Sequence, residues 1–250
     1  MRAFLTLTRR ELTSHFVSLN GYAVIAGVQL LLGQSFWTLL DALNGKPFDM
    51  PVTEKFFDTG FFWLVLLLVT PMITMRTYAL ERATGTFETL MTTPISEAQV
   101  VLAKFCGALA FFVIAWLPAV AYPFLLQHYA EGMAPVDAGP VAATFLGIAL
   151  LGGFYMALGC FASSLTRSQI VAAMTTFAIG LGLFLLGYLS QIRPPEPGWQ
   201  AQLLTHLSML EHMRDFSRGV VDTRHVFFYL SLTTFFLFLT LRVLESRRWK

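Results

Sequence analysis

The sequence predicts an all-α, polytopic membrane protein with six transmembrane helices. Its 250 residues are 56% hydrophobic and only 13% charged, about half the charged fraction of a typical soluble domain. Apolar runs near the roughly 20 residues needed to cross a ~30 Å hydrocarbon core recur six times. The net charge of +2 gives no indication of nucleic-acid binding. We therefore expect a single transmembrane domain over residues 1–250, surrounded by the lipid bilayer.

The first 18 residues predict an interfacial helix. Leu5, Leu12 and Phe16 are scattered among Arg9 and other charged residues, and no small-residue cleavage site follows a short apolar core, so the segment does not resemble a signal peptide. A helix that lies along the membrane surface, with its arginines toward the headgroups, fits this pattern. A frayed polar tail is the alternative.

Six spans follow, none with a lysine, arginine or histidine at its middle, and charge bias orients them. Eleven lysines and arginines fall in the termini and in the connections after the second and fourth spans, against six in the other connections. Positive charge favours the cytoplasmic side, so both termini should be cytoplasmic. The predicted spans are 19–40, 57–75, 105–126, 140–164, 169–190 and 225–241.

The connection after the second span, residues 76–104, carries a signal of its own. Its first part places apolar residues at helical spacing, and Pro94 should end that helix. Ser96 and Gln99 then have the spacing of a capping box, which predicts a second helix start. Two short helices with a hinge suggest a docking surface for a soluble partner. The apolar residues at helical spacing are Leu80, Ala83, Phe87, Leu90 and Met91.

Glu81 and Glu88 leave alternatives open within this segment. They could pair with basic groups of a partner, or brace the segment against the chain's own Arg76 or Arg82. They could also be simply solvated, since exposed ion pairs are often worth less than about 1 kcal/mol.

The fourth span is rich in small residues. Ala149, Gly153 and Ala157 recur every four positions, a spacing that lets helix backbones approach closely. Packing within the six-helix bundle and a seam between two copies both fit this pattern, and the first is favoured.

The connection at 191–224 predicts an amphipathic helix on the extracytoplasmic side. Prolines after Arg193 end the fifth span, and Gly219 lies where a C-cap is expected. The five histidines lie in connections or at span ends, and we expect them at surfaces. Apolar residues recur at spacings of three and four between these points, at Trp199, Leu203, Leu207, Leu210, Met213 and Phe216.

Several kinds of chemistry are absent from the sequence. It contains no G-x-x-x-x-G-K-[ST] loop for ATP phosphates and no H-E-x-x-H motif. No histidine pair has metal-ligand spacing, and Cys106 and Cys160 lie within spans, which excludes a disulfide framework. We therefore expect no catalytic residue, metal or cofactor. An ion-coupled secondary transporter is the alternative, but no span carries the mid-membrane charge that such coupling generally needs.

Three segments resemble the second, export-type class of ABC transporter permeases, and within it the gliding-motility-associated subfamily. The first reads Glu81-Arg-x-x-Gly85-Thr-x-Glu88-x-Leu90-x-x-x-Pro94-Ile-Ser96. The others span residues 207–224, from Leu207-Ser through Glu-His212 to Asp222-x-Arg224, and residues 244–249. One departure is His225, where the subfamily pattern has an acidic residue. Together with the six spans, the likeness covers nearly the whole chain.

The resemblance implies a partner set. A separate cytoplasmic ATPase would bind ATP and Mg. A second permease protomer, identical or related, would complete the pathway. A membrane partner with an extracytoplasmic domain could also belong to the complex. The location would be the bacterial cytoplasmic (inner) membrane. The implied ATPase-coupling residues are Glu81, Arg82, Gly85, Thr86, Phe87, Glu88, Leu90, Met91, Pro94 and Ser96. Residues expected at an outer gate or partner contact are Leu203, Leu207, Leu210, His212 and Phe216.

Overall fold

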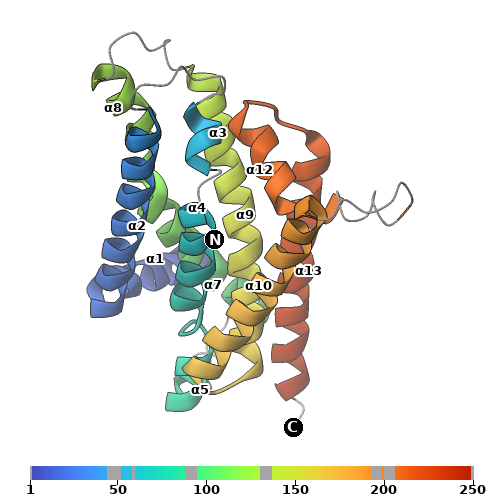
Figure 1. Ribbon diagram of the computed structural model, residues 1–250. Coiled ribbons are helices and arrows are strands. Elements are labelled where there is room, and N and C mark those ends of the chain that lie inside the picture. The colour runs from blue at the N-terminus through green and yellow to red at the C-terminus, as the bar shows by residue number, and fades with distance from the viewer. Residues whose placement is uncertain are drawn as a thin grey trace.

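The computed structural model describes residues 2–43, 52–57, 60–87, 95–129, 137–192, 199 and 206–248. Within these ranges every regular element is a helix, and the long helices run side by side as a bundle (Figure 1). The elements are α1 (Arg2–Val17), α2 (Leu19–Leu43), α3 (Val52–Phe57), α4 (Gly60–Thr74), α5 (Ala79–Thr84), α7 (Glu97–Trp116), the 3-10 turn η1 (Leu117–Val120), α8 (Ala121–Tyr129), α9 (Ala138–Leu165), α10 (Gln169–Ile192), α12 (Met209–Ser217) and α13 (Thr223–Arg248).

The prediction of six membrane-spanning helices is confirmed by length and composition. The candidate spans are Leu19–Asp41, Gly60–Thr84, Glu97–His128, Ala138–Leu165, Gln169–Leu189 and Thr223–Ser246. The second and third spans differ most from their predicted ranges. The second runs to Thr84 rather than to 75, because it continues through a tight turn into α5, and the third begins at Glu97 rather than at 105. The Ser96 capping box starts this helix, and nothing interrupts it before the membrane.

α9 is the most deeply buried of the six and packs against α4, α7, α10, α12 and α13. Three of its glycines allow this close approach. An added Cβ would lie 2.8 Å from the Phe216 ring at Gly147, 2.1 Å from Phe112 at Gly152, and 2.1 Å from the Thr74 hydroxyl at Gly159. These three glycines therefore serve packing within the chain. Of the predicted seam, Ala157 is completely buried, whereas an added Cβ at Gly153 would meet no atom closer than 3.9 Å.

α1 lies across the other helices and packs on the first half of α7 (Figure 1). Leu7 is buried beside Val100 and Ala103 of α7. Gly107 lets the two helices touch, since an added Cβ there would lie only 2.7 Å from the Cβ of Glu11. The expected N-terminal helix therefore exists and is fastened to the bundle.

The bundle has two distinct ends (Figure 1). α5 and the C-terminal end of α13 lie at one end, and α3, α8 and α12 lie at the other. Exposed apolar side chains cover much of α10 and α13, including Ile170, Met174, Phe227 and Phe235, as expected of helices that face lipid.

Candidate coupling site

α5 follows α4 after one tight turn. The backbone N–H of Thr77 donates to the carbonyl of Thr74 at 3.1 Å within this turn. At its other end α5 stops at Gly85, whose φ of 74° lies in the left-handed region, which glycine adopts without a Cβ penalty. This glycine therefore ends α5 well before Pro94, the residue at which the sequence predicted that the helix would end.

Two adjacent serines of α9 hold this turn. The Ser163 hydroxyl accepts hydrogen bonds from the backbone N–H groups of Tyr78 and Ala79, each at 3.1 Å, and donates to the Met75 carbonyl at 3.2 Å. The Arg82 guanidinium donates to the carbonyl of Ser164. The start of α5 is therefore anchored to the end of the central helix.

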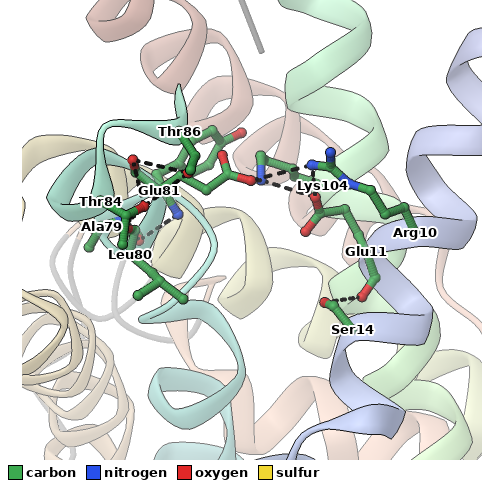
Figure 2. A network of polar contacts seen from close by, with 11 residues as sticks. Arg10, Glu11, Ser14, Ala79, Leu80, Glu81, Thr84, Thr86 and Lys104 are labelled. Atoms are coloured by element: carbon green, nitrogen blue, oxygen red, sulfur yellow. Dashed lines mark hydrogen bonds and ion pairs between the residues drawn. The ribbon is translucent and has the colours of Figure 1, made fainter. Parts of the chain in front are cut away.

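A buried lysine joins α5 to α1 and α7 (Figure 2). Lys104 of α7 is 3% exposed, and its Nζ lies 2.8 Å from Glu81 Oε1 and 3.1 Å from Glu11 Oε1. Arg10 of α1 also reaches both carboxylates, at 3.1 Å to Glu11 and 3.4 Å to Glu81. We call these four residues the Lys104 network. Because it contains two cations and two anions, its formal charges cancel.

Burial gives this network its strength. The side chains of Glu11 and Glu81 are only 13% and 19% exposed, so water screens their attraction to Lys104 weakly. The Tyr78 ring, centred 5.5 Å from Nζ, adds a cation–π contact. Removing one partner would leave an uncompensated charge in a poorly hydrated place. The arrangement fastens three helices together at one end of the bundle.

The expected partners of Glu81 require correction. Neither Arg76 nor Arg82 pairs with it, and it is not simply solvated; Lys104 and Arg10 are its partners. The reason is the early start of α7, which carries Lys104 two turns into a helix instead of leaving it in a loop. Arg82 is directed to Ser164.

The other predicted coupling residues differ in exposure and in the contacts they make. The Thr86 hydroxyl is exposed and lies 2.9 Å from that of Thr84. Phe87 is half-buried, with its ring centre 6.5 Å from that of Tyr78. It packs against a small buried cluster formed by Tyr78, Val101, Cys160 and Leu244. The Ser96 hydroxyl accepts from the Gln99 backbone at 3.3 Å, so the predicted capping box is confirmed. Glu88, Leu90, Met91 and Pro94 lie outside the described residues.

At the opposite end of the bundle, α12 buries one face. Phe216 is completely buried, His212 is 2% exposed, and Leu210 packs against the core. Leu207 is 42% exposed and therefore lies off the buried face, while Leu203 lies outside the described part of the chain. A 2.6 Å ion pair between Arg218 and Glu54 ties α12 to α3.

The expectation of surface histidines is wrong for His212. Its Nδ1 lies 3.1 Å from the Tyr229 hydroxyl, and its ring centre is 4.0 Å from that of His225. His225 Nε2 in turn lies 3.0 Å from a carboxylate oxygen of Asp215. Burial, together with the nearby His225, lowers the pKa of His212 to about 4. Sequence spacing could not reveal this cluster, because α13 supplies half of it.

Sequence reasoning also missed Lys104, Glu11 and Ser163. A signal for Lys104 existed: it lies four residues after Val100 and four before Ala108, on the apolar face of the helix that the capping box starts. No comparable pattern marks Ser163. Among the described residues, no group of three or more His, Cys, Asp or Glu is placed to hold a metal ion.

Six membrane-length helices define a polytopic helical membrane protein. In it, a charged network fastens the short helix α5 at one end of the bundle. Comparison with protein families gives a match to the ABC-2 family transporter protein over residues 17–244, nearly the whole chain. The chain belongs to this family, and is accordingly the membrane-spanning permease component of an ABC transporter. No curated protein matches it.

Proposed function

We propose that this permease couples ATP hydrolysis by a separate cytoplasmic ATPase to substrate movement or force transduction across the membrane. The observation that carries the proposal is the attachment of α5. The Lys104 network ties this short helix to α1 and α7, while Ser163 and Ser164 tie it to α9. A push on α5 would therefore reach several spans at once.

The contact surface for the ATPase would be the outer edge of α5 and the residues that follow it. Ala83, Thr84, Gly85 and Thr86 are all exposed, above a base that is fixed by hydrogen bonds. Phe87 would hold the segment against the bundle at the same time, since part of its ring packs on Tyr78. Glu88, Leu90, Met91 and Pro94, which lie outside the described residues, stay candidates for the same contact on the resemblance alone.

The wider complex follows from the same proposal. The α5 end of the bundle would face the cytoplasm of a bacterium, with both termini on that side, in the inner membrane. A second permease protomer, identical or related, would complete the pathway, and a partner with an extracytoplasmic domain, as in gliding-motility systems, could contact α12. ATP and Mg would bind on the ATPase.

The test compares two added charges at the α5 end. Ala83→Glu places a carboxylate on the proposed contact surface, whereas Thr13→Glu places one on the exposed side of α1. Each variant is expressed with all native subunits, the membrane complex is purified, and P-loop ATPases are identified and quantified by mass spectrometry. We expect Ala83→Glu to reduce ATPase recovery roughly tenfold, because charge in the centre of an interface is costly, and Thr13→Glu to leave it unchanged.

Two outcomes would overturn the proposal. One is a wild-type complex that contains no P-loop ATPase. The other is equal ATPase recovery and equal ATP hydrolysis from Ala83→Glu and Thr13→Glu, which would place the contact elsewhere.

A further inference from the structure

A cleft of about 350 Å³ opens beside the Lys104 network. Helices α1, α2, α4, α5 and α7 all contribute to its walls. Its volume lies near the lower end of the range for small-molecule sites. Its lining contains both polar or charged and apolar side chains. Representative lining residues are Arg10, Ser14, Arg76 and Thr77 among the polar ones, and Met72 and Phe111 among the apolar ones.

Arg76 gives the cleft one uncompensated positive charge. The carboxylates of Glu11 and Glu81 also line it, but the Lys104 network already balances them with Lys104 and Arg10. Among the residues that the structure describes, Arg76 has no hydrogen-bond or ion-pair partner. Burial lowers the pKa of the neighbouring His15 imidazole, which disfavours a second positive charge there. A ligand with a single negative charge would match this lining.

Two residues of the lining each have a buried polar atom that has no hydrogen-bond partner in the described part of the chain. Thr77 is 7% exposed, and its Oγ1 is buried without a hydrogen bond. Glu81 Oε2 is likewise buried and unpaired, although Oε1 of the same carboxylate binds Lys104. Buried polar atoms without partners are rare and costly. The hydroxyl can donate to an acceptor, and the carboxylate oxygen requires a donor.

Several apolar residues of the lining belong to membrane-length helices. Val24 of α2, Met72 and Ile73 of α4, and Phe111 of α7 line the cleft. α1 also lines it, and its Glu11 and Ser14 face the α5 residues Leu80 and Glu81 across the network (Figure 2). The cleft therefore offers charged groups from α1 and α5 and apolar side chains from spanning helices, the two kinds of surface that a lipid needs.

We propose that this cleft binds one anionic phospholipid whose headgroup carries a hydroxyl, such as a phosphatidylglycerol. Its phosphodiester supplies the single negative charge for Arg76 and accepts from Thr77, and its headgroup hydroxyl donates to Glu81 Oε2. Its acyl chains begin along Val24 and Met72. A charge-assisted hydrogen bond from a guanidinium to a phosphate is among the strong ones in proteins.

The test uses the purified full-length chain in detergent, with any subunits that copurify. Native mass spectrometry follows the binding of added phosphatidylglycerol. We expect one tightly retained lipid per chain, and a roughly tenfold weaker affinity in Arg76→Gln, the size of one charge-assisted hydrogen bond. The matched control is Arg167→Gln, which removes one exposed positive charge from the loop between α9 and α10, outside the cleft; it should bind as the wild type does.

A second variant keeps the result independent of folding defects. Thr77→Val retains the shape of the side chain but removes the unpaired hydroxyl. Without lipid its thermal stability should equal or exceed that of the wild type, since a buried hydroxyl without a partner is lost. Its affinity for phosphatidylglycerol should nevertheless fall about threefold or more.

The probes also separate lipid binding from simpler explanations. Diacylglycerol, which has the same tails without phosphate, and deacylated glycerophosphoglycerol, which has the head without tails, should each bind at least tenfold more weakly. Equal binding of phosphatidylglycerol by Arg76→Gln and Arg167→Gln would overturn the proposal. Binding of diacylglycerol as tightly as phosphatidylglycerol would also overturn it. If glycerophosphoglycerol bound as tightly as phosphatidylglycerol, with the same dependence on Arg76, the site would be one for soluble phosphodiesters and the proposal would fail.

Discussion

Lys104 carries a charge in a place where an unpaired charge is strongly destabilising. Its side chain is 2% exposed and is held between two carboxylates that are themselves mostly covered. Replacing it by methionine keeps the length and the helix propensity but leaves Glu11 and Glu81 facing each other. We expect Lys104→Met to lower the free energy of unfolding by about 3 kcal/mol, measured by denaturant unfolding in mixed micelles.

The reason for that loss can be checked with a second substitution. Without Lys104, Arg10 alone balances only one of the two carboxylates. Adding Glu81→Gln to Lys104→Met removes the excess negative charge, so the double variant should be more stable than Lys104→Met alone. Arg9→Met, at an exposed position of α1, should cost little. Strictly additive losses from Lys104→Met and Glu81→Gln would show that the ion pairs do not act together.

His212 should make the protein sensitive to acid. Burial and the proximity of His225 lower the pKa of His212 to about 4, whereas unfolding returns it to about 6.5. Between these values the unfolded chain binds more protons than the folded chain, so stability falls as the pH falls from about 6.5 toward 4. The carboxylate of Asp215 and the imidazole of His206 also face this group.

The pH dependence of thermal unfolding measures this effect. His212→Gln should flatten the decline between pH 6.5 and pH 4, whereas His128→Gln, at an exposed histidine, should keep it. An equal slope in wild type and His212→Gln would assign the acid sensitivity to another group.

At the scale of single helices, two adjacent glycines of α9 have different roles. An added Cβ at Gly152 would lie 2.1 Å from the Phe112 ring, while at Gly153 the nearest atoms lie at 3.9 and 4.0 Å. Gly152→Ala should therefore destabilise the protein by about 1–3 kcal/mol through overpacking. Gly153→Ala should be neutral or gain up to about 1 kcal/mol from helix propensity.

The comparison of these neighbours controls for position and chemistry. Both variants are made in the same helix, and their midpoints of thermal unfolding are compared directly. A Gly153→Ala loss as large as that of Gly152→Ala would mean that α9 tolerates no added methyl group in this region, and that the Phe112 contact is not the cause.

Hydropathy and capping predicted the helices well, because each signal is local in the sequence. Six apolar runs gave six spans, and the Ser96 capping box gave the start of α7. The site was less predictable, since its partners come from distant segments: Glu11 and Lys104 are 93 residues apart, and His212 meets Tyr229 from another helix. From charge type alone we expected Arg76 or Arg82 as the ion-pair partner of Glu81. The partner is Lys104, because the register of α7 directs that side chain toward Glu81.

At the scale of the whole molecule, the bundle places α5 and the end of α13 together and α12 opposite them (Figure 1). The positive-charge bias predicts that the α5 end is cytoplasmic. Single cysteines at Thr84, Ser246 and Val220, all exposed, test this orientation in a background where Cys106 and Cys160 are replaced by alanine. In intact cells whose outer membrane is permeabilised, a membrane-impermeant maleimide should label Val220→Cys alone.

Opening the inner membrane should then make the other two positions reactive. Labelling of Ser246→Cys before opening would reverse the orientation of the C-terminus. Labelling of Thr84→Cys before opening would rule out a cytoplasmic docking role for α5.

The attachments at the two ends of α9 give this helix a mechanical consequence. Its 28 residues make a rod of ~42 Å, longer than the ~30 Å hydrocarbon core. Ser163 fastens one end of the rod to α5, and at the other end Pro140 packs against Gly219, two residues after α12. A tilt of about 5° at one end displaces the far end by about 4 Å over that length. Leverage along a stiff rod can thus carry a movement from one face of the membrane to the other, with no change in the shape of the helix itself.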